Sequence, residues 1–311
     1  MKILFMGTPD FAEVILRAIT LCKEHEVVAA VTQPDRPKGR KKALSESPVK
    51  IYARQCGIPV LQPEKIKNAD EIAKLREYDA DIYVVAAFGQ ILSKEILEIP
   101  RYGCINVHAS LLPKYRGSSP IQRAIADGEE VTGVTVQQMN EGVDTGDIID
   151  FVRVAISPDE TGGSLFDKLA EEGAKLIVKT LSDIEAGRAK RTPQDDTKAT
   201  YAGMLKKEMG RIDWQTDASS IERMIRAYTP WPGGFTYLSQ KVLKITEAEA
   251  LTGNADRPCG TVTEVSKDHF LVACKSGMLR VTKVQAEGKK EMTVHDFLLG
   301  NSLSVGTILG G

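Results

Sequence analysis

At 311 residues the chain has room for about two domains. Its 42% hydrophobic and 27% charged residues are typical of a soluble globular protein, and a net charge of −1 argues against a protein that coats nucleic acid non-specifically. No apolar run reaches membrane-spanning length, the apolar start before Gly7 is too short for a signal peptide, and the five cysteines show no framework spacing, so we expect a cytoplasmic protein.

The first 32 residues predict the start of a βαβ unit. A short apolar strand over 2–6 runs into a turn at Gly7, and apolar residues at helical spacing follow from Phe11. A second buried strand is predicted over 27–32. The dinucleotide-binding fingerprint needs three glycines and this turn has one, so we expect a Rossmann-like scaffold that does not bind NAD.

Residues 33–47 contain a strongly basic loop. Five of the seven residues from Arg36 to Lys42 are Lys or Arg, and two prolines and a glycine predict the absence of regular structure. Such a loop can bind phosphate groups in a salt-dependent way without reading sequence. The alternative is a solvated run of charge with no ligand.

The next stretch alternates helices and strands. We predict helices over 48–56 and 69–77 and strands over 58–61 and 81–87. The continuous apolar run at 81–87 is typical of a central parallel strand that is covered on both faces. Ligands of open α/β sheets bind beyond the carboxyl ends of such strands, so residues 88–92 are a candidate ligand-binding segment, or else a plain connection.

A strand predicted at 103–108 carries side chains that can do chemistry. Because side chains alternate along a strand, Ile105 and Val107 point into a core, while Cys104, Asn106 and His108 share the other face.

Three polar groups in this region suit the transfer of an acyl group to an amine. Asn106 can donate an N–H to a developing oxyanion, and His108 can give or take a proton near neutral pH. Asp144, between two glycines, can orient and charge that histidine. The tetrahedral intermediate carries an oxyanion and the attacking amine must lose protons, so these groups can act without an enzyme nucleophile.

Each of these residues also has a plainer interpretation. A histidine after a strand is usually structural, and an aspartate between glycines usually belongs to an ordinary turn. Cys104 and His108 could ligate a metal, but the sequence has four histidines and no Cys-x-x-Cys or His-x-x-x-His pair, so we expect no metal site.

The sequence from residue 120 onward predicts the rest of the first domain and then a second, smaller domain. A helix over 120–126, strands over 132–139 and 148–156 and a long helix over 164–185 complete the first domain. The second domain is predicted to contain a helix over 219–228 and short strands over 235–238, 242–246, 260–265, 269–274 and 279–284.

Short strands at this spacing are typical of a small OB-like β-barrel. We therefore predict a catalytic domain over 1–189, a linker over 190–205 and an OB-like domain over 206–311. Aromatic side chains of the second domain could stack on bases or fill its core, namely Trp214, Trp231 and Phe235.

Several motifs together resemble the folate-dependent formyltransferases. The signature is the order Asn106-x-His108, Ser110-Leu-Leu-Pro113, Tyr-Arg-Gly117 and Asp144. The likeness runs nearly end to end, through Gly7-Thr-Pro-Asp-Phe11, Ala87-Phe-Gly-Gln-Ile-Leu92 and Tyr201-Ala. The basic loop and the second domain are similar to those of the family members that act on tRNA.

The resemblance implies a function and a set of site residues. It implies that the protein transfers the formyl group of 10-formyltetrahydrofolate to initiator methionyl-tRNA for translation initiation. It also implies a Rossmann-like α/β domain that is followed in the sequence by a smaller OB-like β-barrel domain. We expect a monomer with no metal, no membrane attachment and no obligate protein partner. The implied residues are Asn106, His108 and Asp144 for catalysis, Ser110, Leu111, Leu112, Pro113, Gln90 and Leu92 for folate, and Arg36, Arg40, Lys41 and Lys42 for tRNA.

Two other functions are compatible with the sequence. A formyltransferase for a small amine, such as an amino sugar, would keep the motif at 106–144 but would not need both the basic loop and a barrel domain. A non-enzymatic RNA-binding protein would not depend on Asn106, His108 or Asp144.

Overall fold

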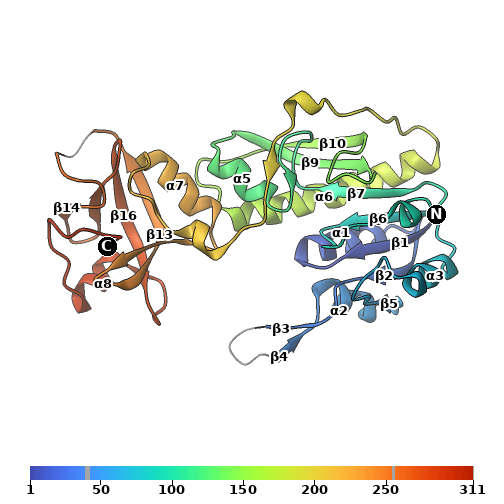
Figure 1. Ribbon diagram of the computed structural model, residues 1–311, viewed down its shortest axis with the longest axis horizontal. Coiled ribbons are helices and arrows are strands. Elements are labelled where there is room, and N and C mark those ends of the chain that lie inside the picture. Colours follow the sequence, from blue (N-terminus) through green and yellow to red (C-terminus); the bar gives the residue numbers. More distant parts are fainter. Residues whose placement is uncertain (39–42, 254–255, 311) are drawn as a thin grey trace. The chain divides into compact units, whose positions relative to one another are not determined.

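The computed structural model describes residues 1–38, 43–253 and 256–310, and Figure 1 labels their helices and strands. The chain forms two compact units. Unit 1 comprises 1–120, 131–155 and 166–202, and unit 2 comprises 121–130, 156–165 and 203–311. In the described ranges, no helix is long and apolar enough to cross a membrane.

Unit 1 is built on one seven-stranded sheet. Five neighbouring strands run parallel, from β5 to β7, and β9 and β10 add to the β7 side in antiparallel pairing. The predicted Rossmann-like, mostly parallel sheet is therefore confirmed. In sheet order the strands are β10 (Ile148–Ala155), β9 (Val131–Gln138), β7 (Cys104–His108), β6 (Ile82–Ala86), β1 (Lys2–Gly7), β2 (Glu26–Val31) and β5 (Val60–Leu61).

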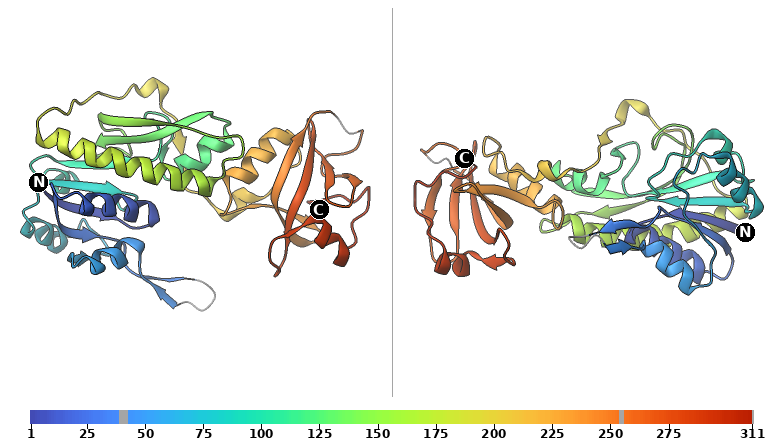
Figure 2. Two further views of the ribbon diagram at one scale, coloured as in Figure 1. Left: turned by 180° about the vertical axis from the view of Figure 1, so that it is seen from behind. Right: turned by 60° about the horizontal axis from the view of Figure 1, so that its bottom comes forward.

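Helices cover both faces of this sheet. From behind, α1 and the long α6 lie across one face (Figure 2). Gly173 of α6 lies close to Val107 and Val134 of the sheet, where a Cβ would be 3.4 Å from each side chain. On the other face, Ile72 and Leu75 of α3 and Ile96 of α4 share a core with alternate residues of β1, β6 and β7. The helices are α1 (Asp10–Leu21), α2 (Pro48–Gln55), α3 (Ala69–Glu77), α4 (Lys94–Leu97) and α6 (Gly162–Glu185).

The flanks of the basic loop form regular structure, so the sequence prediction for this stretch is wrong. β3 (Arg36–Lys38) and β4 (Ala43–Ser45) pair as a short antiparallel hairpin. Pro37 is tolerated because the two strands form a separate sheet in which each is an edge strand. Arg40, Lys41 and Lys42 lie outside the described residues.

Two further short strands of unit 1 join distant parts of the chain. β8 (Arg116–Gly117) pairs in parallel with β11 (Tyr201–Ala202). A 3₁₀ turn at Asp196–Lys198 precedes β11. Residues 192–202, inside the range predicted as a linker, therefore pack as part of unit 1.

Unit 2 is a six-stranded antiparallel sheet with two helices against it. Its core includes Trp214, which is 6% exposed and donates its indole N–H to Thr236 Oγ1 at 3.2 Å, so Trp214 fills the core. The antiparallel sheet is consistent with the expected OB-like barrel. Its elements are α7 (Ala218–Ala227), β12 (Gly234–Leu238), β13 (Lys241–Leu251), β14 (Val262–Val265), β15 (Phe270–Ala273), β16 (Met278–Ala286), β17 (Met292–Thr293) and α8 (Val294–Gly300). The same unit takes in most of α5 (Pro120–Ala126) and a short 3₁₀ helix at Lys207–Gly210.

Candidate active site

Asn106 and His108 lie at the carboxyl end of β7, on one face. Cys104, on the same face at the start of the strand, is fully buried, and its thiol points to the carbonyls of Ile96 and Leu97 in α4. Two residues further on, Asn106 is half-buried. His108 is 6% exposed. On this face Asn106 is therefore the partly exposed residue, between two buried ones.

Asp144 returns to this strand end from the turn after β9. Its carboxylate accepts three hydrogen bonds: from Gly117 N at 2.8 Å, from Gln137 Nε2 at 2.8 Å and from Asn106 Nδ2 at 3.3 Å. The φ angle of Asp144 is +54°, a left-handed conformation that is uncommon outside glycine. A glycine would adopt this conformation more easily, but the aspartate places a carboxylate beside Asn106.

The ring of His108 is held at both nitrogens. Nε2 lies 2.9 Å from the carbonyl oxygen of Tyr115, and Nδ1 lies 3.6 Å from Asp144 Oδ2. A carbonyl can only accept, so Nε2 carries a hydrogen. Nδ1 is thus left facing the carboxylate of Asp144.

Gln137 of β9 is a site residue that sequence reasoning did not identify. It is 1% exposed, and its amide donates to Asp144 Oδ1. Because side chains alternate along a strand, Gln137 lies on the same face as Thr135, which contacts the loop after β7. Two polar side chains that share one face of the predicted strand, Thr135 and Gln137, were the available signal.

The residues expected to shape the folate side are fixed by their own hydrogen bonds. Ser110 is fully buried and donates to the carbonyl of Lys114 at 2.7 Å. Thr135 Oγ1 accepts from Leu112 N at 3.1 Å and donates to Ser110 O at 2.7 Å. The Ser110–Pro113 stretch is therefore a rigid wall next to His108. Leu111 and Pro113 are its half-buried members.

Gln90 and Leu92 lie after β6, the neighbouring strand in the sheet. The Gln90 amide bridges the backbone of a second loop, because it donates to Pro63 O at 2.9 Å and accepts from Ile66 N at 2.8 Å. Leu92 is 4% exposed and belongs to the core. Both side chains are thus engaged away from the Asn106, His108 and Asp144 group, so any folate contact there falls to the backbone of 88–92.

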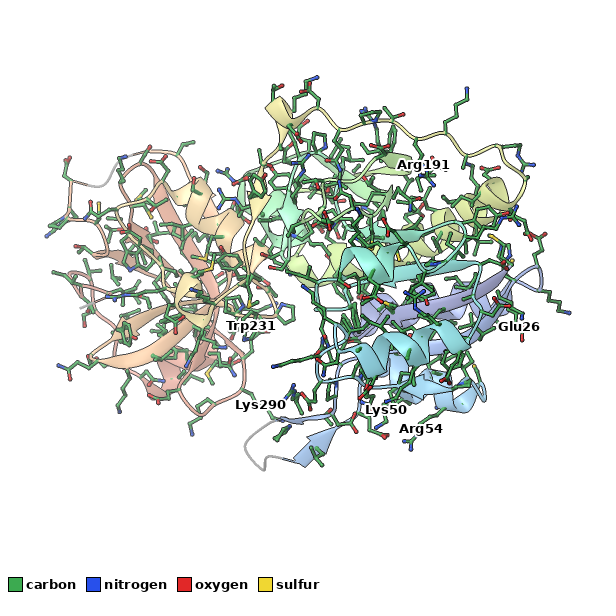
Figure 3. All side chains as sticks on the ribbon, turned by 45° about the vertical axis from the view of Figure 1, so that its right-hand side comes forward. Glu26, Lys50, Arg54, Arg191, Trp231 and Lys290 are labelled. Atoms are coloured by element: carbon green, nitrogen blue, oxygen red, sulfur yellow. The ribbon has the colours of Figure 1, made fainter. Side chains whose placement is uncertain are left out.

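Arg36 is the member of the expected tRNA-binding set that the structure describes. It is exposed and pairs with exposed Glu64 at 3.0 Å, a contact that contributes little in water. Beside the hairpin, Lys50 and Arg54 project from α2 (Figure 3). Lys50 is held by Asp35 and Glu46, and Arg54 by Glu46. These ion pairs tie both flanks of the basic loop to α2.

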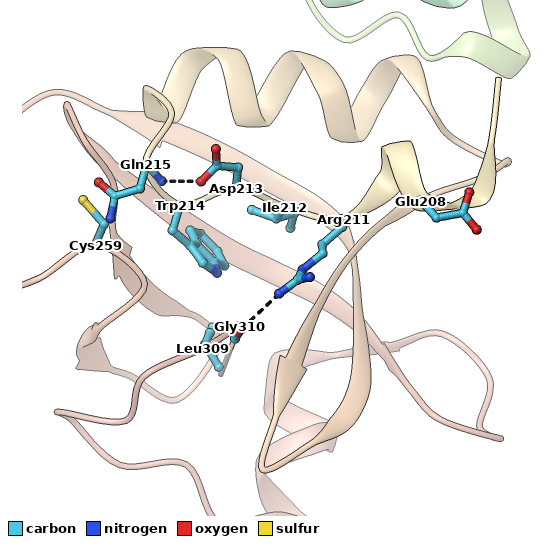
Figure 4. Close-up of a pocket in the computed structure, with 9 residues that line it drawn as sticks. All are labelled: Glu208, Arg211, Ile212, Asp213, Trp214, Gln215, Cys259, Leu309 and Gly310. Carbon is cyan, nitrogen blue, oxygen red and sulfur yellow. Dashed lines mark hydrogen bonds between the residues drawn. The ribbon is translucent and has the colours of Figure 1, made fainter. Parts of the chain in front are cut away.

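A cavity of about 500 Å³ lies elsewhere, in unit 2 (Figure 4). Trp214 forms one wall, and Arg211 donates across it to Gly310 O at 3.4 Å. None of the described residues expected for catalysis, folate or tRNA phosphates lines this cavity, although Trp214 was considered as a base-stacking residue. Its lining residues are Glu208, Arg211, Ile212, Asp213, Trp214, Gln215, Cys259, Leu309 and Gly310.

One group of potential metal ligands occurs in the part of the chain that the structure describes. Cys22, Glu24 and His25 bring their ligand atoms within 4.8 Å of one another. They follow the carboxyl end of α1, near the amino ends of the parallel strands. Asn106 and His108 lie at the other ends of these strands, where β7 ends. Burial is the main cause that lowers the pKa of His25. This group lies apart from the Asn106, His108 and Asp144 group.

An amide, an imidazole and a carboxylate gather at the end of a central strand of an α/β sheet, and these are side chains that an enzyme of group transfer can use. Comparison with known proteins specifies the class. Residues 1–181 match the formyl transferase family, and residues 204–302 match the formyl transferase C-terminal domain. The chain belongs to the formyl transferase family, as the sequence motifs indicated.

Relatives with established names cover the whole chain. The methionyl-tRNA formyltransferase of Agathobacter rectalis is 51% identical over 307 residues, which are 99% of each chain. That of Lachnospira eligens is 50% identical over 316 aligned positions, which span both chains completely. The sugar 3N-formyltransferase WlaRD, solved with dTDP and 5-N-formyltetrahydrofolate, has a TM-score of 0.67 at 19% identity and covers 93% of this chain and 99% of its own. That structural likeness shows the shared fold.

Proposed function

We propose that this enzyme transfers the formyl group of 10-formyltetrahydrofolate to the α-amino group of initiator methionyl-tRNA, in the cytoplasm, as a step of translation initiation. The observation that carries the proposal is full-length identity of 50–51% to proteins named for this reaction. The contacts among Asn106, His108 and Asp144 support it, because they supply the groups that the chemistry needs. The presence of a formylated folate in a solved relative supports the donor.

The reaction forms a bond from the formyl carbon to the amine and breaks the bond to N10 of the folate. The neutral amine attacks the formyl carbon, and the carbonyl oxygen takes up negative charge. Asn106 donates one Nδ2 hydrogen to Asp144, which leaves the second hydrogen for this oxygen. Such an oxyanion donor contributes about 10²- to 10³-fold in rate.

His108 and Asp144 handle charge and protons. With Nε2 held by the Tyr115 carbonyl, the His108 ring helps Asn106 to stabilise the oxyanion. Asp144, which faces His108 Nδ1, accepts the proton that the attacking amine loses, directly or through water, and the proton reaches N10 as the folate departs. Positioned acid and base groups contribute about 10²- to 10⁴-fold in rate.

The two substrates approach from defined elements. The folate lies against the 110–113 wall and the backbone of 88–92, the set of Ser110, Leu111, Leu112, Pro113, Gln90 and Leu92. The tRNA phosphates bind the basic loop through Arg36, Arg40, Lys41 and Lys42, which act as point charges and do not read sequence.

The test is a direct assay of acceptor choice. The purified protein is incubated with 10-formyltetrahydrofolate and either methionyl-tRNA or a free amino sugar, and charged and formylated tRNA are separated on an acid gel. Formylation of the tRNA alone is expected. Formylation of the sugar alone would keep the chemistry and discard the tRNA, and no product from either would overturn the proposal.

A further inference from the structure

Residues 192–202, named here the strap, contact both loops that form the active site. At one end, Thr192 and Ile148 exchange backbone hydrogen bonds of 2.8 Å, just after the Asp144 turn. At the other end, β11 pairs with β8, and Thr200 O accepts from Arg116 N at 2.9 Å. The strap thus ties the loop after β7 to the turn that carries Asp144.

Gln194 is the strap residue closest to the chemistry. Its half-buried side-chain amide donates to the carbonyl of Asp144 at 2.9 Å and to that of Gly146 at 2.7 Å. It also lies 3.5 Å from Gln137 Oε1, and Gln137 in turn donates to the Asp144 carboxylate. Gln194 therefore holds the backbone of Asp144, while Gln137 holds its side chain.

Arg116 fixes the direction of this amide. Its guanidinium, 2% exposed, donates to Gln194 Oε1 from Nε at 3.1 Å and from Nη2 at 2.8 Å. Nη2 also reaches Asp196 at 2.6 Å. Burial lowers the pKa of Arg116, but hydrogen bonds to Asp196 and Tyr201 outweigh it and the pKa is raised, so the group stays charged. With Oε1 facing donors, the Gln194 N–H₂ must face the two carbonyls.

The Asp144 turn needs such support. Asp144 has a positive φ, and non-glycine residues keep this conformation where their surroundings over-determine it. Its backbone carbonyl is held by Gln194, and its carboxylate is held by Gly117 N, which lies in the strand paired with the strap. Both hydrogen bonds therefore depend on the strap: one comes from Gln194 itself, and the other comes from β8, which pairs with the strap.

We propose that Gln194 is a positioning residue for Asp144 and that the strap is a structural part of the active site, an inference that rests on the proposed role of Asp144 in formyl transfer. Removing the Gln194 donor lets the turn relax, so that Asp144 loses its alignment with His108 and the amine. A misplacement of about 1 Å costs roughly 10²-fold in rate. The effect falls on turnover, because Gln194 acts on the substrates only through Asp144.

The decisive variant is Gln194→Glu. A glutamate still accepts from Arg116, so the buried guanidinium keeps its partner, but it cannot donate to the two carbonyls. We expect kcat on methionyl-tRNA to fall about ten- to a hundredfold, with the KM for tRNA and for folate unchanged and the melting temperature within a few degrees of wild type. Gln55→Glu, the same change at an exposed site of α2, is the control and keeps wild-type kcat.

A second measurement keeps the inference independent of the assigned substrate. Hydrogen exchange of the Gly117 N–H, which donates to Asp144, is expected to be faster in Gln194→Glu than in wild type or Gln55→Glu. If the wild type formylates nothing, the proposed function fails while the exchange result still tests the strap. Unchanged kcat in an active enzyme, or unchanged protection of Gly117, would overturn the positioning role, and a parallel rise in KM would indicate a binding role instead.

Discussion

The backbone N–H of Gly117 donates to Asp144 Oδ2 at 2.8 Å, and this is the carboxylate oxygen that faces the His108 ring. Gly117 has a φ of +112°, and a Cβ on it would lie 2.6 Å from the carbonyl oxygen of Ala202. Only glycine can therefore keep β8 against β11 while it presents its N–H to the carboxylate.

Gly117→Ala is expected to destabilise the protein and to lower its activity together. The methyl group pushes β8 away from the Ala202 carbonyl, which costs about 1–3 kcal/mol of unfolding free energy, and moves the N–H off Asp144. Chemical denaturation and kcat on methionyl-tRNA measure the two effects. Gly203→Ala, next to the same contact but with open space at its Cβ, should change neither. Wild-type stability and activity in Gly117→Ala would mean that this hydrogen bond is dispensable.

The three polar residues Asn106, His108 and Asp144 should be needed for turnover and not for folding. Asn106→Ala, His108→Ala and Asp144→Ala are each expected to lower kcat at least about a hundredfold, because they remove an oxyanion donor, an imidazole that can give or take a proton, or a proton acceptor. Steady-state kinetics and circular dichroism provide the measurements. Asn68→Ala, at an exposed asparagine whose side chain does not cap α3, is the control. Near-normal turnover of the His108 variant would end the proposed mechanism.

Cys104 shares the face of Asn106 and His108 but should be chemically silent. Burial raises the pKa of its thiol far above the ordinary value, and its Sγ points to α4 rather than to the site. Cys104→Ala is expected to keep kcat within about twofold and to cost roughly 1–2 kcal/mol of stability because a buried side chain is shortened. A thiol reagent should label exposed Cys56 in the folded protein and spare Cys104. Loss of activity in Cys104→Ala would revive a metal or nucleophile role.

Patterns with a short period predicted much of the fold. The period of two at 103–108 correctly placed Asn106 and His108 on one strand face, because alternation needs no knowledge of the partner strands. The apolar run at 81–87 likewise identified the central strand β6, and the boundaries of α3 and α5 agree with the predicted ranges. No periodic pattern placed Asp144 beside this strand: its pairing with His108 was a chemical hypothesis, which the family resemblance then favoured.

Long-range polar contacts could not be read in the same way. Gln194 lies 50 positions from Asp144, inside a stretch without apolar periodicity, so its hydrogen bonds leave no local signal. The hairpin at Arg36–Ser45 was missed because residue propensity describes single positions, whereas strand pairing is a relation between two segments. In both cases the structure depends on a contact between two segments, which the pattern within one segment does not show.

The stability that Asp35 contributes at the base of the basic loop should be lost in acid. Hydrogen bonds from Lys50 and then Gln62 lower the pKa of Asp35 below its ordinary value of 3.8. A depressed folded-state pKa gives stability that is present above the unfolded pKa, about 3.9, and is lost as the pH falls through the folded pKa. Asp35→Asn should therefore melt at a lower temperature than wild type at pH 7, with the gap closing below about pH 4. A gap that does not narrow as the pH falls below about 4, or that exposed Asp159→Asn reproduces, would contradict this origin.

The basic loop itself should act on tRNA binding and not on chemistry. Changing Arg36, Arg40, Lys41 and Lys42 together to glutamine removes four charges that we assign to phosphate groups of the tRNA. For every phosphate that the protein no longer neutralises, the slope of log affinity against log salt becomes shallower by about 0.9 for duplex and about 0.7 for single strands.

We expect a higher KM for methionyl-tRNA in this variant and a flatter dependence on salt. The value of kcat at saturating tRNA should stay close to wild type, because these charges hold phosphates and take no part in the reaction at Asn106, His108 and Asp144. Lys65→Gln with Lys67→Gln, two exposed lysines on the loop that precedes α3, controls for the loss of positive charge at another place, although it removes two charges and not four. Filter binding across a salt series measures the slope directly. If tRNA affinity and its slope both survive, the charge run is solvated and the acceptor must be held by other elements.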